Sequence, residues 1–496
     1  MSVPARAANE IKDASANRPR VSPDRESGRA LHADAEAPRG SAPAGPPKRA
    51  PIPPGVFFFG SVFEGWRDPL GLFLRGRAQY GDAVQYRFGW YRYFLFNDPA
   101  AIKHVLTDNA RNYTKSRNYQ GLKVIFGNGL LTSEGEFWKR QRRLSQPAFH
   151  RDRLVGFANT MASETNRMLA RWQHLPRSSD GHAPVLDVHA EMMRLTFAIV
   201  GQTLFTTDVD GDSSAIGEAL QYSLEWANDY AESIVRVPPW VPTPRNAGFK
   251  KAVRTIDDLF TRIIDERRRS GSDGDDLLGM LMSARGDDGK ERMTERQLRD
   301  EVLTLVLAGH ETTANLLAFT FHLLSCHPEW ERRVVAEVRQ VIGEREIRFE
   351  DVRRLEITRM VLEEALRLYP PAWTFERQAV EDDVVAGYAV PKGSIVGISP
   401  YSLHRHPGLW ENPEGFDPER FTPERKEARN KYAYLPFGGG PRTCIGNAFA
   451  MMEAQIILAK VLRDHTLARV PARPLELSPL ITLRPKHGIW VEVGGR

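Results

Sequence analysis

The spacing of apolar side chains changes along the chain. Residues 83–88 and 93–96 alternate apolar and polar side chains, which is typical of half-buried strands. From 136 to about 345 the apolar residues recur at helical spacing, and short strand patterns return around 378–400 and 476–493. The pattern therefore predicts a mainly α protein with a small β-sheet region, with strands near both ends of the chain.

One predicted helix is long enough to cross a whole domain. Thr294 and Gln297 form a capping-box pattern, and helical spacing then continues over residues 298–326. At about 1.5 Å per residue this helix spans on the order of 45 Å. Its middle, residues 303–308, is apolar on nearly every side, so we expect a buried central helix.

Polar residues interrupt this helix directly after its apolar middle. The run Gly309-His310-Glu311-Thr312-Thr313 contains a glycine and two threonines, which are poor helix formers. The Thr312 hydroxyl can bond to the Ala308 carbonyl and loosen the helix there, which leaves room for a small polar guest. The alternative is an ordinary kink with Glu311 facing solvent.

A glycine-dense turn near the C-terminus precedes a single cysteine, in the run Phe437-Gly438-Gly439-Gly440-Pro441-Arg442-Thr443-Cys444-Ile445-Gly446. The glycines let the backbone approach a flat cofactor closely. A helical pattern starts just after Cys444, and free N–H groups at a helix N-terminus favour an anion, so we expect a lowered pKa for this thiol. A thiolate fixed in this way can be an axial ligand of haem iron. The alternative is a buried cysteine that acts as a small hydrophobic residue.

The composition narrows the possible functions. With 41% apolar and 26% charged residues, the 496-residue chain fits a soluble globular enzyme, and its two cysteines suit the reducing cytoplasm. A formal charge of +5 without a compact basic run gives no sign of nucleic-acid binding. No apolar run reaches about 18 residues, so we expect no membrane span.

The first 50 residues differ in composition from the rest of the chain. Residues 1–50 have almost no large apolar side chains and predict a disordered Pro/Ala/Arg-rich tail before a single domain over 51–496.

The cysteine run resembles the haem-binding signature FxxGxRxCxG of the cytochrome P-450 family of haem-thiolate monooxygenases. Every specified position matches: Phe437, Gly440, Arg442, Cys444 and Gly446. The resemblance implies a cytochrome P-450 fold, with a long central helix over the haem and the cysteine loop beneath it. It also implies that the cofactor is haem b (iron protoporphyrin IX), that Cys444 is the axial iron ligand, and that Phe437, Arg442 and Gly446 contact the cofactor.

The interrupted helix resembles a second motif of this family, A-G-x-[DE]-T-T. That resemblance implies that Thr312 orients bound dioxygen and that Glu311 delivers protons from solvent. Trp138 and Arg142 resemble the WxxxR motif, which implies contacts with the haem propionates. Arg377 is a weaker propionate candidate by its family position.

Two more runs resemble the family's ExxR and PERF motifs. The first contains Glu364 and Arg367, and the second contains Arg420. The resemblance implies a buried Glu364–Arg367–Arg420 network behind the cysteine loop, with a structural role. Helical spacing alone would also allow Glu363 to pair with Arg367, and it is the motif that selects Glu364.

The resemblance also indicates where a substrate binds and what else the enzyme needs. Family positions assign the substrate pocket to Phe126, Val306, Ala308, Trp373 and Phe375. An apolar pocket implies a lipophilic substrate, such as a fatty acid, terpenoid or polyketide-like molecule, and the wider sequence looks most like fatty-acid-hydroxylase-like bacterial members.

The expected reaction inserts one oxygen atom from O2 into a C–H or C=C bond. No flavin or nicotinamide segment follows the cysteine run, so electrons from NAD(P)H should arrive through a separate reductase and a ferredoxin or flavodoxin. Two alternatives stay open: a haem-dependent peroxygenase or isomerase, and a non-catalytic haem-binding protein.

Overall fold

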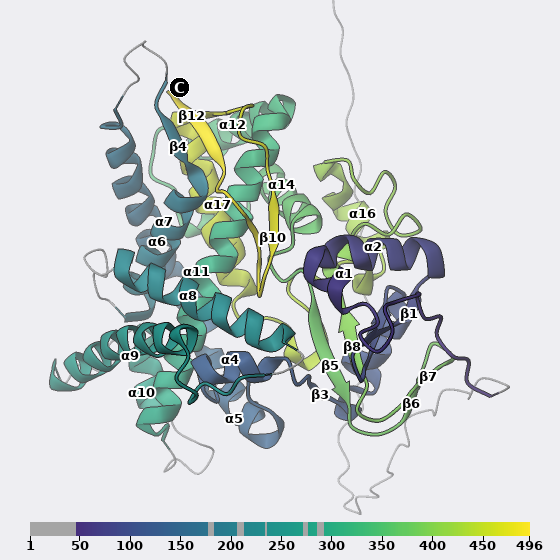
Figure 1. Cartoon of the computed structure of the whole chain (residues 1–496). Helices are drawn as coiled ribbons and strands as arrows, with labels where there is room; N and C mark the ends of the chain where they lie inside the picture. The colour runs from purple at the N-terminus through teal and green to yellow at the C-terminus, as the bar shows by residue number, and fades with distance from the viewer. Residues whose placement is uncertain (1–45, 177–182, 206–212, 234–235, 271–275, 285–291) are drawn as a thin grey trace, which may run out of the picture. The chain divides into compact units, whose positions relative to one another are not determined.

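The computed structural model describes residues 46–176, 183–205, 213–233, 236–270, 276–284 and 292–496 (Figure 1). Residues 1–45 of the expected N-terminal tail lie outside the described residues, so the disorder of that tail stays a prediction. The described chain begins just before Lys48, which bridges to Tyr388.

The α-helices occupy most of the described chain. With 58% of the structure helical, the expected mainly α fold is confirmed. The helices are α1 Val62–Arg67, α2 Pro69–Tyr80, α3 Pro99–Lys103, α4 Tyr119–Phe126, α5 Gly135–Ser145, α6 Arg151–Trp172, α7 Val188–Phe205, α8 Ser213–Glu232, α9 Pro244–Ser270, α10 Leu277–Ser283, α11 Glu295–Cys326, α12 Pro328–Val341, α13 Phe349–Val352, α14 Glu356–Leu368, α15 Pro400–Leu403, α16 Pro423–Ala428 and α17 Asn447–Asp464.

The strands form small sheets. They are β1 Ala83–Phe88, β2 Tyr91–Phe96, β3 Tyr113–Lys115, β4 Val185–Asp187, β5 Phe375–Ala379, β6 Asp383–Val385, β7 Tyr388–Val390, β8 Ile395–Ile398, β9 His465–Arg469, β10 Leu477–Pro479, β11 Leu483–Pro485 and β12 Trp490–Gly495. The largest sheet has the order β1-β2-β8-β5-β3, in which only the β2–β8 pair is parallel. It therefore joins strands from the first and last thirds of the chain, whereas the alternation pattern predicts only that strands occur near both ends.

Helix α11 crosses the helical part of the molecule and packs against α7, α14 and α17 (Figure 1). Thr294 and Gln297 form the predicted capping box at its first turn. Leu303, Leu317 and Phe319 are fully buried, and each contributes roughly 1.5–3 kcal/mol of hydrophobic stabilisation. By length and composition α11 is the one described helix that could cross a membrane, but it is mostly buried in the protein, as the core helix of a globular domain would be.

Candidate active site

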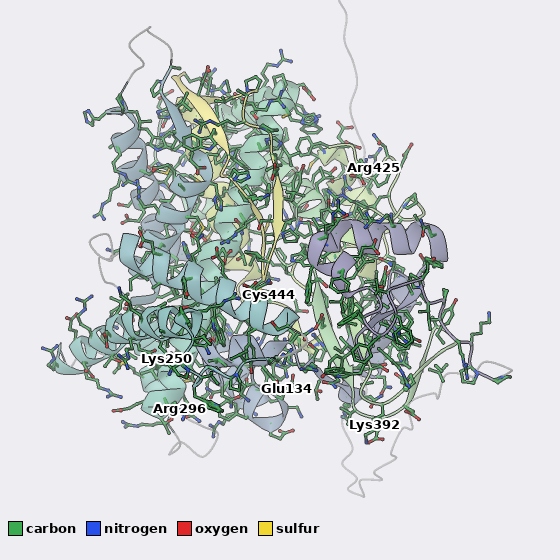
Figure 2. The ribbon with its side chains drawn as sticks, viewed as in Figure 1. Glu134, Lys250, Arg296, Lys392, Arg425 and Cys444 are labelled. Carbon is green, nitrogen blue, oxygen red and sulfur yellow. The ribbon has the colours of Figure 1, made fainter. Side chains whose placement is uncertain are left out.

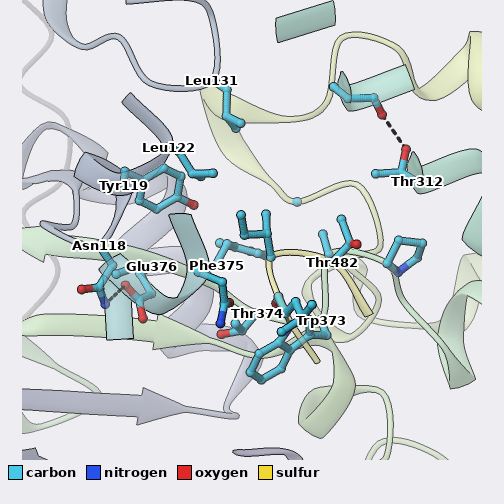
Figure 3. Close-up of a pocket in the computed structure, with 18 of the residues that line it drawn as sticks. Asn118, Tyr119, Leu122, Leu131, Thr312, Trp373, Thr374, Phe375, Glu376 and Thr482 are labelled. Carbon is cyan, nitrogen blue, oxygen red and sulfur yellow. Dashed lines mark hydrogen bonds between the residues drawn. The ribbon is translucent and has the colours of Figure 1, made fainter. Parts of the chain in front are cut away.

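A large cavity separates α11 from the cysteine loop. Its volume is about 610 Å³, and most of its lining is apolar. Segments far apart in sequence supply the lining: α4, α8, α11, β5, the turn at 480–482 and the cysteine loop at 436–446. Cys444 belongs to this lining and lies in the middle of the view in Figure 2. The close-up in Figure 3 shows Leu131, Thr312 and Phe375 around the cavity.

The glycines of the cysteine loop have a conformation that few other residues adopt. Gly438 and Gly440 have φ values of 70° and 66°. A Cβ on Gly440 would lie 2.0 Å from the carbonyl oxygen of Leu106, so this position excludes any larger residue. The turn is closed by the Cys444 amide, which donates to the Phe437 carbonyl at 2.9 Å. The backbone thus fixes Cys444 three residues before α17 begins.

The Cys444 thiol opens into the cavity, although protein surrounds it on all other sides. Burial raises the pKa of this thiol, while the Gly446 amide and the Arg142 guanidinium act in the opposite direction. The sequence-based expectation of a lowered thiol pKa is therefore wrong for the protein alone. The physical reason is that loss of hydration outweighs one amide and one nearby cation.

Three cationic side chains meet at one edge of the cavity. Lys115 and Arg377 face each other across the β3–β5 pair, and Arg442 lies close to both. Among the residues that the structure describes, the only carboxylate bonded to these side chains is Glu134, which pairs with Arg442. Burial and the two arginines hold the pKa of Lys115 well below its usual range. The cluster thus has more positive charge than the described residues around it neutralise.

This excess charge is what the carboxylates of a haem would neutralise. A planar cofactor with two propionates at one edge fits a cavity that has a thiol on its floor and Lys115, Arg377 and Arg442 at its rim. The residues present therefore fit haem. Sequence reasoning missed Lys115, because nothing in a short strand ending in lysine indicates which residue lies opposite.

Trp138 and Arg142 do not line the cavity but contact residues that border it. The guanidinium of Arg442 stacks over the Trp138 ring at 3.9 Å and donates to the Ser133 carbonyl at 2.9 Å. Arg142 donates to the Thr443 carbonyl at 2.8 Å. The structure thus places Trp138 under an arginine at the rim and Arg142 against the cysteine loop.

Helix α11 brings polar groups to the opposite side of the cavity. The Thr312 hydroxyl donates to the Ala308 carbonyl at 2.6 Å, so the predicted bond within the helix is confirmed. Glu311 is buried, lines the cavity, and accepts a hydrogen bond from Thr482. Burial raises the pKa of the Glu311 carboxyl, and the Thr482 hydroxyl and Arg484 partly oppose that rise. The alternative of a solvent-facing Glu311 is therefore excluded.

The structure brings Glu364, Arg367 and Arg420 together. Arg367 donates to both oxygens of Glu364 at 2.7 Å, and the Arg420 Nε lies 3.4 Å from Glu364 Oε1. Neither Glu364 nor Arg367 is exposed at all. Glu363, which spacing alone left possible, pairs instead with Lys426.

This network connects to the segment that precedes the cysteine loop. Arg367 also donates to the His404 carbonyl, and the His404 ring accepts from the Leu435 amide at 2.9 Å. The Tyr434 hydroxyl donates to the Glu363 carbonyl at 2.7 Å. The buried charges therefore help to hold the chain just before Phe437.

Four of the five expected pocket residues line the cavity: Phe126, Ala308, Trp373 and Phe375. Val306 does not, because its side chain is buried in the core around α11. Its neighbours Leu305 and Leu307 line the cavity instead. The difference arises because each step along a helix turns the side chain by about 100°.

Comparison with known proteins agrees with this geometry. Residues 50–490 match the family model described as Cytochrome P450. The chain belongs to the cytochrome P450 family. As a member, it is an oxidoreductase, a haem-thiolate monooxygenase that uses O2, and it needs a redox partner.

Similar P450 proteins occur in Streptomyces. Cyclooctatin synthase of Streptomyces melanosporofaciens is 38% identical over 84% of this chain and 89% of its own length. Cyclooctat-9-en-7-ol 5-monooxygenase of the same organism is 35% identical over 88% of this chain and 94% of its own. Pentalenene oxygenase of Streptomyces avermitilis is 34% identical over 86% of this chain and 93% of its own length.

Proposed function

We propose that this P450 hydroxylates or epoxidises a lipophilic terpenoid held between Thr312 and Cys444. The observation that carries the proposal is that these two side chains line the same, mostly apolar cavity from α11 and from the cysteine loop. A substrate in that cavity is shielded from water and bound mainly by apolar contact.

Haem would be held by the Cys444 thiolate, with its propionates at Lys115, Arg377 and Arg442. When bound, it supplies the activation of dioxygen, and its thiolate ligand favours O–O cleavage. Phe437 and Gly446 line the cavity beside the thiol and would contact the ring. Trp138 would support Arg442 from below, and Arg142 would stabilise the loop that presents the thiol.

Thr312 and Glu311 would handle the protons that the reaction consumes. The Thr312 hydroxyl donates to a helix carbonyl, and rotation about one bond turns its proton toward the cavity. Glu311 is adjacent in sequence, and burial raises the pKa of its carboxyl, so it holds a transferable proton more readily than an ordinary glutamate does.

The terpenoid substrate class rests on the lining and on the relatives. Apolar side chains such as Phe126, Leu131 and Phe375 surround the space above Cys444. Relatives at 34–35% identity are named for cyclooctat-9-en-7-ol and pentalenene, and both are terpenoid oxygenases. These names favour a terpenoid over the fatty acid that the wider sequence resemblance first indicates. We further propose that the protein is cytoplasmic and takes electrons from NAD(P)H through a separate reductase and a ferredoxin or flavodoxin.

The test is turnover of a terpenoid panel by haem-loaded protein with a ferredoxin, its reductase, NAD(P)H and isotopically labelled O2. We expect a product that contains one labelled oxygen atom. Product formed only from added peroxide, without NAD(P)H, would favour the peroxygenase alternative. A terpenoid that changes the absorption spectrum on binding, but gives no product with either NAD(P)H and the redox proteins or peroxide, would favour a non-catalytic haem protein.

A further inference from the structure

A line of polar side chains leads from α7 to Glu311. His189 Nε2 lies 2.9 Å from Asn315 Oδ1, and Asn315 Nδ2 lies 3.4 Å from Thr482 Oγ1. Thr482 in turn bonds to Glu311. Thr482 lines the cavity and is labelled in Figure 3, whereas His189 is partly exposed. The line therefore connects the cavity with the periphery of α7.

The hydrogen bonds of this line have one consistent direction. Thr482 has a single hydroxyl proton, which it donates to the Glu311 carboxylate. Its oxygen is then free to accept from the Asn315 amide, and the Asn315 carbonyl can accept from His189 Nε2–H. Every donor thus points toward Glu311, and donors aligned in a chain strengthen one another in a buried site.

The charged groups around Glu311 are few. Arg484 favours the ionised carboxylate but is itself paired with Glu225.

Burial shifts the pKa values of other titratable groups nearby. His310 is buried and its pKa is lowered to about 4, so it is neutral. Burial likewise lowers the pKa of His189, against the effect of Asp187. On α17, burial raises the pKa of the Glu453 carboxyl well above its usual range. The hydrogen bonds from His189 through Asn315 and Thr482 are therefore one of the main interactions that stabilise the Glu311 carboxylate relative to its acid form.

We propose that His189 and Thr482 are positioning residues that orient Glu311 and hold it as a carboxylate at the cavity wall. The inference rests on the proposed proton-delivery role of Glu311. A carboxylate in a fixed orientation can accept a proton from the solvent side and offer it beside Thr312. A Glu311 that is turned away from Thr312, or whose acid form is too stable to release its proton, would let reduced oxygen species escape as peroxide without product.

Two matched pairs of variants test this inference. Thr482→Val removes the hydroxyl at nearly constant shape, and Thr482→Ser keeps it. His189→Leu removes the ring donor, and His189→Gln keeps an N–H group at a similar distance from the backbone. For each haem-loaded protein we would measure product per NAD(P)H against pH. In the same proteins, infrared spectroscopy would follow the protonated-carboxyl band that Glu311→Gln removes.

Loss of a hydrogen bond to a charged group corresponds to about a tenfold change in the ratio of carboxylate to acid. We therefore expect Thr482→Val to move the infrared titration and the pH profile of coupling about one pH unit upward. His189→Leu should move both in the same direction by less, because its effect passes through Asn315. Thr482→Ser and His189→Gln should restore the wild-type profiles.

Glu311→Gln separates this inference from the role of Glu311. If Glu311→Gln keeps normal coupling, the proposed role of Glu311 is wrong. If Glu311→Gln uncouples the enzyme but Thr482→Val and His189→Leu leave both the infrared titration and the pH profile unchanged, the positioning inference alone is overturned. Should Thr482→Val fail to fold, the His189 pair decides between the same two outcomes.

Discussion

Glu301 gives a pH-dependent test of how the loop over the cavity is held. This carboxylate on α11 is fully buried and accepts from the Leu130 amide and from Gln141 Nε2, each at 3.0 Å. The first bond holds the loop at Leu130, directly before Leu131 at the cavity wall, and the second joins α11 to α5. Burial raises the pKa of Glu301 to about 7, against an ordinary value of 4.5.

The raised pKa makes the folded protein less stable as pH increases. Between pH 4.5 and about 7 the folded state keeps the Glu301 proton that the unfolded chain releases. The free energy of unfolding is therefore unaffected by this group below pH 4.5 and decreases as the pH rises from 4.5 through about 7. At about 1.4 kcal/mol per pH unit, the loss amounts to about 3 kcal/mol at pH 8. Glu301→Gln carries no such charge, and its amide can donate to Gln141 Oε1, which has no partner among the described residues.

The assay is urea unfolding of wild type and Glu301→Gln at pH 5 and pH 8. We expect similar stability at pH 5 and a variant that is more stable by up to about 3 kcal/mol at pH 8. Glu381→Gln is the control, because Glu381 forms an exposed pair with Lys392 and should change little at either pH. A difference between wild type and Glu301→Gln that is the same at both pH values would show that Glu301 does not titrate with a raised pKa in the folded protein.

Three other substitutions probe the site. Glu364→Gln leaves Arg367 buried without its anion and should lower the unfolding free energy by about 3–5 kcal/mol. The exposed control Glu381→Gln should change it by less than about 0.5 kcal/mol, and equal urea midpoints for the two variants would contradict this expectation. Lys115→Gln removes one cation from the cluster that would bind the haem propionates, so haem transfer to apomyoglobin should become about tenfold faster. An unchanged transfer rate would place the propionates elsewhere. Thr312→Ala should lower product per NAD(P)H by about tenfold or more, with Thr312→Ser close to wild type; full coupling in Thr312→Ala would exclude a proton role.

Local sequence patterns predicted the features that depend on neighbouring residues. The capping box at Thr294 and the Thr312–Ala308 bond involve residues within one helical turn, and both are present. The glycine turn before Cys444 follows from the conformations that only glycine adopts easily.

Features that depend on packing between distant segments could not be predicted in this way. Lys115 reaches the cavity rim because β3 pairs with β5, about 260 residues later in the chain. Thr482 meets Glu311 only when the turn at 480–482 folds against α11. The thiol pKa of Cys444 depends on how completely the surrounding protein excludes water, which no spacing of residues reveals.

We propose that Cys444 binds the iron of a haem in this cavity as its axial thiolate. The most direct measurement is the absorption spectrum of the reduced, CO-bound, haem-loaded protein, for wild type and for variants of each cysteine. The wild type and Cys326→Ser, whose cysteine lies at the end of α11 away from the cavity, should show the red-shifted Soret band of thiolate ligation. Cys444→Ser should lack that band. A wild type without the band, or a Cys444→Ser protein that keeps it, would contradict the account.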